Sequence, residues 1–259
     1  MKKIFGKLYI LIIMLFLYLP ILTLMVLSFN EAKSMAVFTR FSLCWYQELF
    51  QSKLMLGAIV NTFSIAILAA LIATLVGTLA VLGIDAMKPR TENILLAANN
   101  IPMLNADIVT GIALMLFFLM LGIPRGYCTI LFSHATFCIP YVILSVRPRL
   151  NKNTDKLFEA ALDLGASEKY AFRKIVLPEL KPGIMSGFLL SFTMSVDDFI
   201  ITYFTRGAGI NTISTLIYSE VKIGIRPSLF ALSTIIFVVA LVVLIIVNVQ
   251  QGKADRRMA

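Results

Sequence analysis

Six apolar stretches of about 20 residues or more restrict what this sequence can fold into. A bilayer core about 30 Å thick is crossed by about 20 helical residues. Within lipid, only helices and closed barrels satisfy every backbone group, and the period-two alternation of barrel strands is absent here. The sequence therefore predicts an all-α polytopic membrane protein with six transmembrane helices at about residues 8–29, 57–84, 95–121, 127–146, 183–204 and 228–249.

The distribution of positive charge predicts the orientation of these helices. Of the 23 Lys and Arg residues, 16 lie in the N-terminus, the 85–93 loop, the 147–182 segment and the tail from residue 252. The positive-inside rule makes those parts cytoplasmic, so we expect both termini inside. The net charge of +9 is then mostly a topology signal, and nucleic acid is not an expected partner. The first apolar stretch is too long for a signal peptide, so we expect it to be retained.

Several chemistries lack the residues that they require. The three cysteines have no C-x-x-C spacing, and the single histidine, His134, has no evident partner for a metal site. A membrane-embedded enzyme would need a nucleophile with a base, or clustered metal ligands, so we expect no catalytic activity. The sequence contains no G-x-x-x-x-G-K-[S/T] phosphate loop, so we expect this chain to bind no ATP itself.

The cytoplasmic segment at about 147–182 predicts two short helices joined at a glycine. Asn153 or Thr154 is a candidate cap for the first helix, and Gly165 is suited to ending it in a left-handed conformation. Ser167 is a candidate cap for the second helix, which we expect to stop near Pro178. The first helix carries an apolar stripe made of Leu157, Phe158, Ala161, Leu162 and Leu164.

The same segment contains the pattern E-A-A-x3-G-x9-I-x-L-P, from Glu159 to Pro178. It resembles the signature loop of permease subunits in binding-protein-dependent ABC importers. Without the resemblance, the segment would be an amphipathic hairpin packed on its own bundle or lying on the lipid. The resemblance implies a MetI-like type I permease fold, a single transmembrane domain over residues 1–259, and an ATPase-coupling loop that includes Glu159, Ala160, Ala161, Leu162, Gly165 and Ala166.

Residues 131–140, 177–181, 190–198 and 217–224 resemble permeases of spermidine and putrescine importers, which lie in the bacterial inner membrane. This resemblance implies a sister permease subunit, a dimer of ATPase subunits and an extracytoplasmic polyamine-binding protein as partners. It also implies that ATP and Mg²⁺ are used by the ATPase and not by this chain. The alternatives are a permease for another small solute or, from outside the family, a secondary transporter or channel, which would have no reason for the Glu159 to Pro178 pattern.

Acidic residues inside the predicted helices suggest the substrate. Asp107 and Asp197 lie about 18 and 20 Å along their helices from the inner ends, near the depth where transporter sites gather. A buried carboxylate is costly, so each should face a cavity or a partner. Polyamines need separated anions and apolar or aromatic surfaces. The predicted substrate path contains Asp107, Asp197, Asp198 and Tyr203, with Phe204 and Tyr141 as further aromatic candidates.

Other roles stay open for some of these residues. Asp197 and Asp198 point about 100° apart on a helix, so one of them is also a candidate cap of a broken helix. Asp107 is a candidate cap of a kinked third helix. His134 suits either a proton relay or an interhelical hydrogen bond. Two outer segments are expected to be structured: an amphipathic or aromatic-belt piece at residues 38–54, and a bent or re-entrant loop at 206–227.

Overall fold

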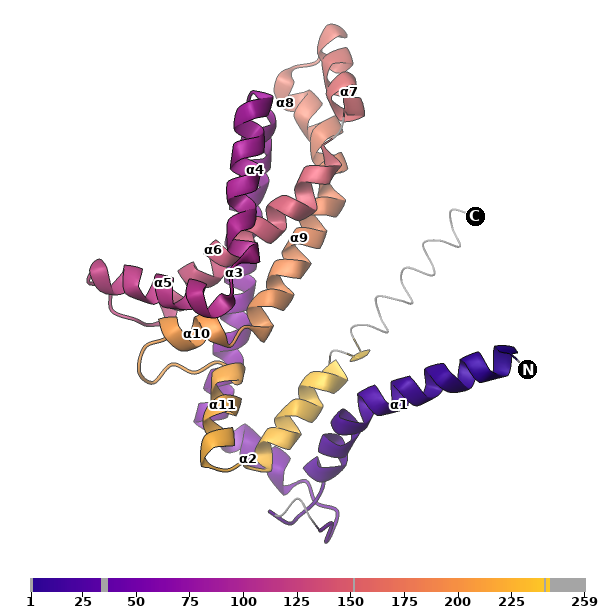
Figure 1. Ribbon diagram of the computed structural model, residues 1–259, viewed down its shortest axis with the longest axis vertical. Coiled ribbons are helices and arrows are strands. Elements are labelled where there is room, and N and C mark those ends of the chain that lie inside the picture. Colours follow the sequence, from indigo (N-terminus) through magenta and orange to yellow (C-terminus); the bar gives the residue numbers. More distant parts are fainter. Residues whose placement is uncertain (1, 34–36, 151, 240, 243–259) are drawn as a thin grey trace. The chain divides into compact units, whose positions relative to one another are not determined.

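The computed structural model describes residues 2–33, 37–150, 152–239 and 241–242, with the side chains of residues 2–5, 152, 153 and 155 left aside. The chain forms two compact units, one of residues 57–216 and one of residues 1–56 with 217–259. The described residues are mostly helical (Figure 1). The helices are α1 (Lys2–Ser28), α2 (Cys44–Gln51), α3 (Lys53–Asp85), α4 (Pro89–Leu104), α5 (Asp107–Met120), α6 (Tyr127–Val146), η1 (Arg147–Arg149), α7 (Lys152–Asp163), α8 (Glu168–Ala171), η2 (Phe172–Val176), α9 (Leu177–Asp197), α10 (Ile200–Thr205), α11 (Ile213–Ile223) and Ser228–Val239.

The larger unit is organised around the packing of α6 against α9 (Figure 1). Two glycines on α9 let the backbones approach: a Cβ at Gly183 would lie 2.9 Å from the Ser145 carbonyl oxygen, and one at Gly187 would lie 3.3 Å from the Cα of Val142. Small residues at such contacts are typical of membrane helix pairs. The buried core beside this contact contains Ala73, Val81, Cys138, Val142, Ile143, Val146, Leu150, Val176 and Leu180.

The predicted third membrane helix, residues 95–121, is not continuous. It is divided into α4 and α5, which meet at an angle of 102° (Figure 1). Asn105 and Ala106 are extended, with ψ angles of 148° and 135°. Pro102 removes a hydrogen-bond donor from the last turn of α4, and Asp107 places a negative charge in the first turn of α5. Both features favour a new helix start, as the sequence had suggested for Asp107.

The predicted fifth helix also differs from the structure at both ends. The chain remains helical from Glu168 to Asp197, so the second loop helix does not stop at Pro178. Pro178 lies in the first turn of α9, directly after the π-helical η2, whose wider turn accommodates the missing amide donor. At the other end α9 stops at Asp197, and the six-residue helix α10 follows after a break at Asp198 and Phe199.

The smaller unit contains α1, α2 and the Ser228–Val239 helix. Trp45 and Leu49 of α2 are buried, and the Trp45 indole donates to the Asn30 carbonyl at 2.6 Å. The Asn30 side chain in turn accepts from the Thr39 amide at 3.0 Å. The predicted amphipathic helix is therefore confirmed, but Trp45 is packed on its own chain and does not serve as an exposed belt anchor, because its indole has found a backbone partner.

Four helices among the described residues are long and apolar enough to cross a membrane, and the bent α4–α5 pair is a candidate for a fifth. The predicted sixth helix is described only in part, as the shorter apolar helix Ser228–Val239; the C-terminal tail from residue 252 lies outside the described residues. The segment at 206–227, predicted as a bent loop, contains the helix α11, and Gly224 with φ of +132° follows it. The glycines of this segment lie before and after α11 and not within it.

Candidate functional site

The three predicted acidic residues come together at the two helix breaks. Asp107 begins α5, Asp197 ends α9, and Asp198 follows at once. All three line one open cavity of about 370 Å³. The two breaks are what allow this, because residues 197 and 198 of an unbroken helix would point about 100° apart. The remaining lining residues are Phe137, Thr193, Met194, Phe199, Ile200 and Ile201.

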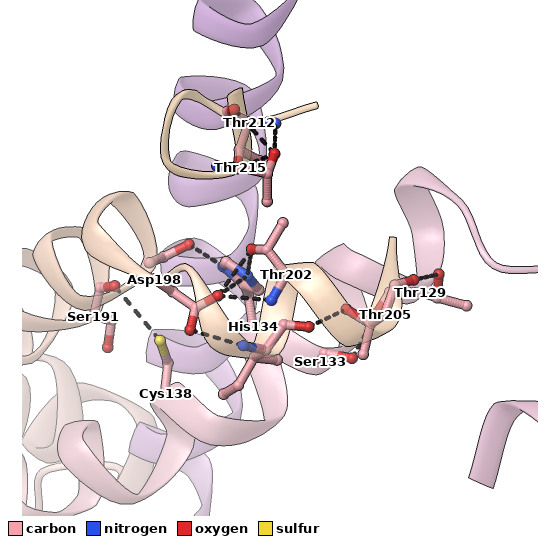
Figure 2. Close-up of polar contacts among 12 residues, drawn as sticks. Thr129, Ser133, His134, Cys138, Ser191, Asp198, Thr202, Thr205, Thr212 and Thr215 are labelled. Atoms are coloured by element: carbon pink, nitrogen blue, oxygen red, sulfur yellow. Dashed lines mark hydrogen bonds and ion pairs between the residues drawn. The ribbon is translucent and has the colours of Figure 1, made fainter. Parts of the chain in front are cut away.

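Asp198 is bound into the fold. Its Oδ1 accepts from the Ile201 amide at 3.2 Å, and its Oδ2 accepts from the amide and hydroxyl of Thr202, both at 2.8 Å (Figure 2). The His134 Nε2 lies 3.2 Å from the same Oδ2, and the His134 Nδ1 lies 2.6 Å from the Ser195 hydroxyl. Asp198 lies one residue before Phe199, the N-cap residue of α10, and its carboxylate caps the first turn of that helix by accepting from two of its amides. His134 makes the interhelical hydrogen bonds that the sequence had suggested as one alternative.

Asp107 and Asp197 differ from Asp198 in that both are exposed to the cavity. Neither makes a hydrogen bond or an ion pair with any residue that the structure describes. A carboxylate inside the hydrocarbon core of a membrane is expected to have a partner or to face a water-filled cavity. These two carboxylates thus face the cavity without a partner among the described residues, whereas both oxygens of Asp198 already accept hydrogen bonds from the fold.

Tyr203 does not line this cavity itself, although its ring centre lies 5.5 Å from that of Phe199, which does. It lines a different cavity, of about 520 Å³, together with Arg125, Phe204 and Arg206. The Arg206 guanidinium lies 5.7 Å from the Tyr203 ring centre, so the ring faces a cation of its own chain. The structure does not bring Tyr203 or Tyr141 to the lining of the acidic cavity.

The aromatic residues that line the acidic cavity are Phe137 and Phe199, which sequence reasoning did not single out. Phe199 directly follows the acidic pair, and Phe137 lies one helical turn after His134, so neighbourhood in sequence was an available signal. Within the described parts of the chain, no three His, Cys, Asp or Glu side chains form a group that could hold a metal ion.

The predicted coupling loop forms a helix, a glycine bend and a second helix. Gly165 has φ of +86°, its amide donates to the Leu162 carbonyl at 2.8 Å, and the Ala166 amide donates to the Ala161 carbonyl at 3.0 Å. This pair of bonds is a Schellman motif, which requires a left-handed residue at the position of Gly165. Glu159, Ala160 and Gly165 are exposed, while Ala161, Leu162 and Ala166 are half-buried.

Other details of the predicted loop are corrected. The helix α7 already includes Lys152, so Asn153 and Thr154 lie within its first turn and not at its cap. Ser167 occupies the N-cap position of α8, but its side chain makes no capping bond. The apolar stripe is split, because Leu164 is 90% exposed and Leu157 is 59% exposed.

The loop is anchored to the rest of its unit by apolar and ionic contacts. Phe158 packs against the core cluster that includes Leu150 and Val176. Just before the loop, Arg147 pairs with Asp85 at 3.2 Å and also with Glu92. Segments that charge counting placed on the cytoplasmic side, at 85–93 and 147–182, therefore contact one another. The exposed tip, including Leu164, extends from a fixed base.

Comparison with known proteins agrees with this arrangement. Residues 86–259 match the family described as binding-protein-dependent transport system inner membrane component. The chain is 37% identical over 231 residues to the spermidine/putrescine transport system permease protein PotC of Haemophilus influenzae, covering 89% of this chain and 90% of that protein. It is 38% identical over 228 residues to the putrescine transport system permease protein PotI of Escherichia coli, covering 85% of this chain and 81% of that protein.

Among solved structures, a bacterial ABC transporter involved in the import of the acidic polysaccharide alginate contains a similar chain, with a TM-score of 0.72. The sequence identity is 16%, and the match covers 97% of this chain and 96% of that one, so the likeness concerns the fold. The helical fold, the loop pattern and the matched residues agree, and the chain belongs to the family of binding-protein-dependent transport system inner membrane components, the permease subunits of ABC importers.

Proposed function

We propose that this permease carries polyamines, with spermidine and putrescine as the candidate substrates. Two curated relatives, both more than a third identical to this chain, are named as spermidine/putrescine and putrescine permeases. The observation that carries the proposal is the acidic cavity where the two helix breaks meet, since Asp107 and Asp197 face it without a partner among the described residues.

The lining of this cavity suits a flexible organic cation. It contains three carboxylates and no Lys or Arg. Phe137 and Phe199 offer ring faces that attract ammonium groups, while Met194, Ile200 and Ile201 offer apolar surface to the methylenes between them. Two separated carboxylates can each accept charge-assisted hydrogen bonds from a different amine, which an anionic or neutral solute would not exploit.

The test is uptake of labelled spermidine and putrescine by the reconstituted importer. Asp197→Asn and Asp107→Asn remove charge with little change of shape. We expect each to raise the KM about tenfold or more, because a hydrogen bond to a charged group is worth about 1.5 to 3 kcal/mol. Glu48→Gln is the matched control, since Glu48 is an exposed carboxylate of α2 and does not line the cavity.

An unchanged KM in both aspartate variants would remove the assigned path. A wild-type importer that carries neither polyamine but does carry another small solute would favour the alternative, a permease for a different substrate. Loss of polyamine uptake in Glu48→Gln to the same degree would show that the assay reports the protein's general charge and not this cavity.

The loop around Glu159 to Gly165 is proposed as the docking site for a separate ATPase subunit. The tip is exposed and carries Leu164 and Tyr170, which are 90% and 59% exposed. Its base is fixed to the membrane helices through Phe158 and Arg147, so a force on the tip is passed to them. ATP and Mg²⁺ would be bound by that ATPase, and this chain would contribute no catalytic residue.

Charge reversal at the tip tests the docking site. Glu159→Lys should abolish ATP-driven uptake while the protein still inserts in the membrane, because Glu159 is exposed and its replacement disturbs no buried contact. Lys156→Glu, one helical turn earlier and also exposed, is the control for charge alone. Uptake at the wild-type rate in Glu159→Lys would sink the docking proposal.

The complete subunit is proposed to have six membrane spans in the inner membrane, with cytoplasmic termini, and to act with a sister permease and an extracytoplasmic polyamine-binding protein. Contacts within the larger unit are consistent with the assignment of segments to two sides: Arg147 meets Asp85 at one end of α3, and near its other end the Asn61 amide donates to the Asn211 carbonyl of the predicted outer loop at 3.0 Å. Labelling of single cysteines placed at residues 165 and 209 by a membrane-impermeant reagent should occur from opposite sides.

A further inference from the structure

His134 is buried in the middle of α6, with a side chain that is 1% exposed, and no part of the proposed transport step requires it as a ligand. Both of its ring nitrogens are nevertheless used. The Nδ1 faces the hydroxyl of Ser195 on α9, and the Nε2 faces Thr202 of α10 at 2.9 Å and Asp198 at 3.2 Å (Figure 2). One imidazole therefore joins three helices at the break between α9 and α10.

The hydrogen-bond pattern assigns the proton. The Thr202 hydroxyl donates its only hydrogen to Asp198 Oδ2, so it can only accept from His134. The His134 Nε2 therefore carries a hydrogen directed at Thr202 and Asp198, and the Ser195 hydroxyl is then suited to donate to Nδ1. With this bond, Asp198 Oδ2 has three donors around it, and Oδ1 also accepts from the Ile201 amide, so this carboxylate is held mainly by the fold.

The cavity wall beside Asp197 depends on this arrangement. If α9 continued through residue 198, Asp197 and Asp198 would be turned about 100° from one another and the cavity wall at Phe199 would not form. Capping of the Ile201 and Thr202 amides by Asp198 stabilises the separate start of α10. The cap ends α9 at Asp197 and leaves that carboxylate at the cavity.

We propose that His134 is a positioning residue for transport: it holds Asp198 in place as the cap of α10, and so commits Asp198 to the fold and Asp197 to the substrate cation. The role of Asp197 in binding a cation rests on the proposed polyamine function. The role of His134 in holding Asp198 does not. Of the two neighbouring aspartates, Asp198 thus stabilises the helix break and Asp197 binds the substrate.

The first arm of the test measures polyamine uptake by the reconstituted importer. His134→Leu should raise the KM about tenfold with a smaller change in maximal rate, the size expected from losing a helix cap. His134→Gln, whose amide can still donate to Asp198, should restore most of the affinity. In an Asp197→Asn background, His134→Leu should add less than about twofold, because both changes act on the same carboxylate.

The second arm measures hydrogen exchange of the peptide containing Ile201 and Thr202, which does not depend on the substrate. His134→Leu should speed this exchange and His134→Gln should not. Ser133→Ala is the control, because within the described part of the chain the Ser133 hydroxyl bonds the Thr129 carbonyl of its own helix. If His134→Leu does not insert, Thr202→Val replaces it, since it removes the hydroxyl between His134 and Asp198.

Independent, multiplying effects of His134→Leu and Asp197→Asn on the KM would overturn the proposal, as would unchanged exchange in α10. If the wild-type importer carries no polyamine, the proposed function fails, and the exchange arm still decides whether His134 holds the cap.

Discussion

Replacement of Gly165 by alanine isolates the backbone requirement of the coupling loop. Gly165 has φ of +86°, and a Cβ built there would have no neighbouring atom within 4 Å. Steric contact therefore contributes nothing, and the effect comes from the left-handed conformation alone. For an L-residue other than glycine this conformation costs about 1 to 2 kcal/mol. Asparagine tolerates this conformation better than alanine, so the cost in Gly165→Asn should lie between that of the wild-type glycine and that of Gly165→Ala.

A cost of 1 to 2 kcal/mol shifts the equilibrium between the capped and the uncapped loop by about 5- to 30-fold. The Ala166 amide, which donates to Ala161 at 3.0 Å, reports this equilibrium. Its hydrogen exchange should accelerate by the same factor in Gly165→Ala and by less in Gly165→Asn. ATPase stimulation by the loaded binding protein should fall in the same order. Equal exchange in all three proteins, or equal acceleration in Ala and Asn, would refute this reasoning.

Two further substitutions test packing. Gly183→Ala places a Cβ 2.8 Å from the Arg149 Cγ and 2.9 Å from the Ser145 carbonyl, so we expect a loss of about 1 to 3 kcal/mol and a lower unfolding temperature. Gly83→Ala, with no atom within 4 Å and a place inside α3, should not destabilise the protein. Trp45→Phe removes the buried indole bond to Asn30 at 2.6 Å and should cost about 1 to 3 kcal/mol. Faster proteolysis of the 37–52 segment would report it; the exposed Phe50→Leu is the control, and equal rates would contradict the assignment.

Local patterns were sufficient for much of the fold and of the site. Apolar length identified the helices at residues 8–29, 57–84 and 127–146, because a helix that satisfies its own backbone is the local solution in lipid. Gly165 was identifiable as a helix end, since its conformational freedom is intrinsic to the residue. The carboxylates of the third and fifth stretches were identifiable as well, because a charge within an apolar stretch is costly in lipid unless it has a partner or faces a cavity.

Hydropathy had no means of detecting the breaks at Asn105 and at Asp198, since both lie within apolar runs whose composition suits a continuous helix. The break at Asn105 is favoured by the nearby Pro102 and Asp107. The break at Asp198 depends on a tertiary partner, because His134, more than 60 residues away, bonds its carboxylate together with Thr202. The same holds for Pro178, which a π-helical turn accommodates, and for Trp45, which a carbonyl 15 residues earlier holds buried.

The sequence by itself thus determined the class of the protein, several of its long helices and the carboxylates on which transport is proposed to depend, because burial in lipid and glycine geometry act at the level of single segments. Only the tertiary structure decided which of the three carboxylates that line the cavity is also hydrogen-bonded into the fold, and that Tyr203 lines a different cavity. Those choices depend on hydrogen-bond partners from α6, α9 and α10, whose approach no single segment encodes.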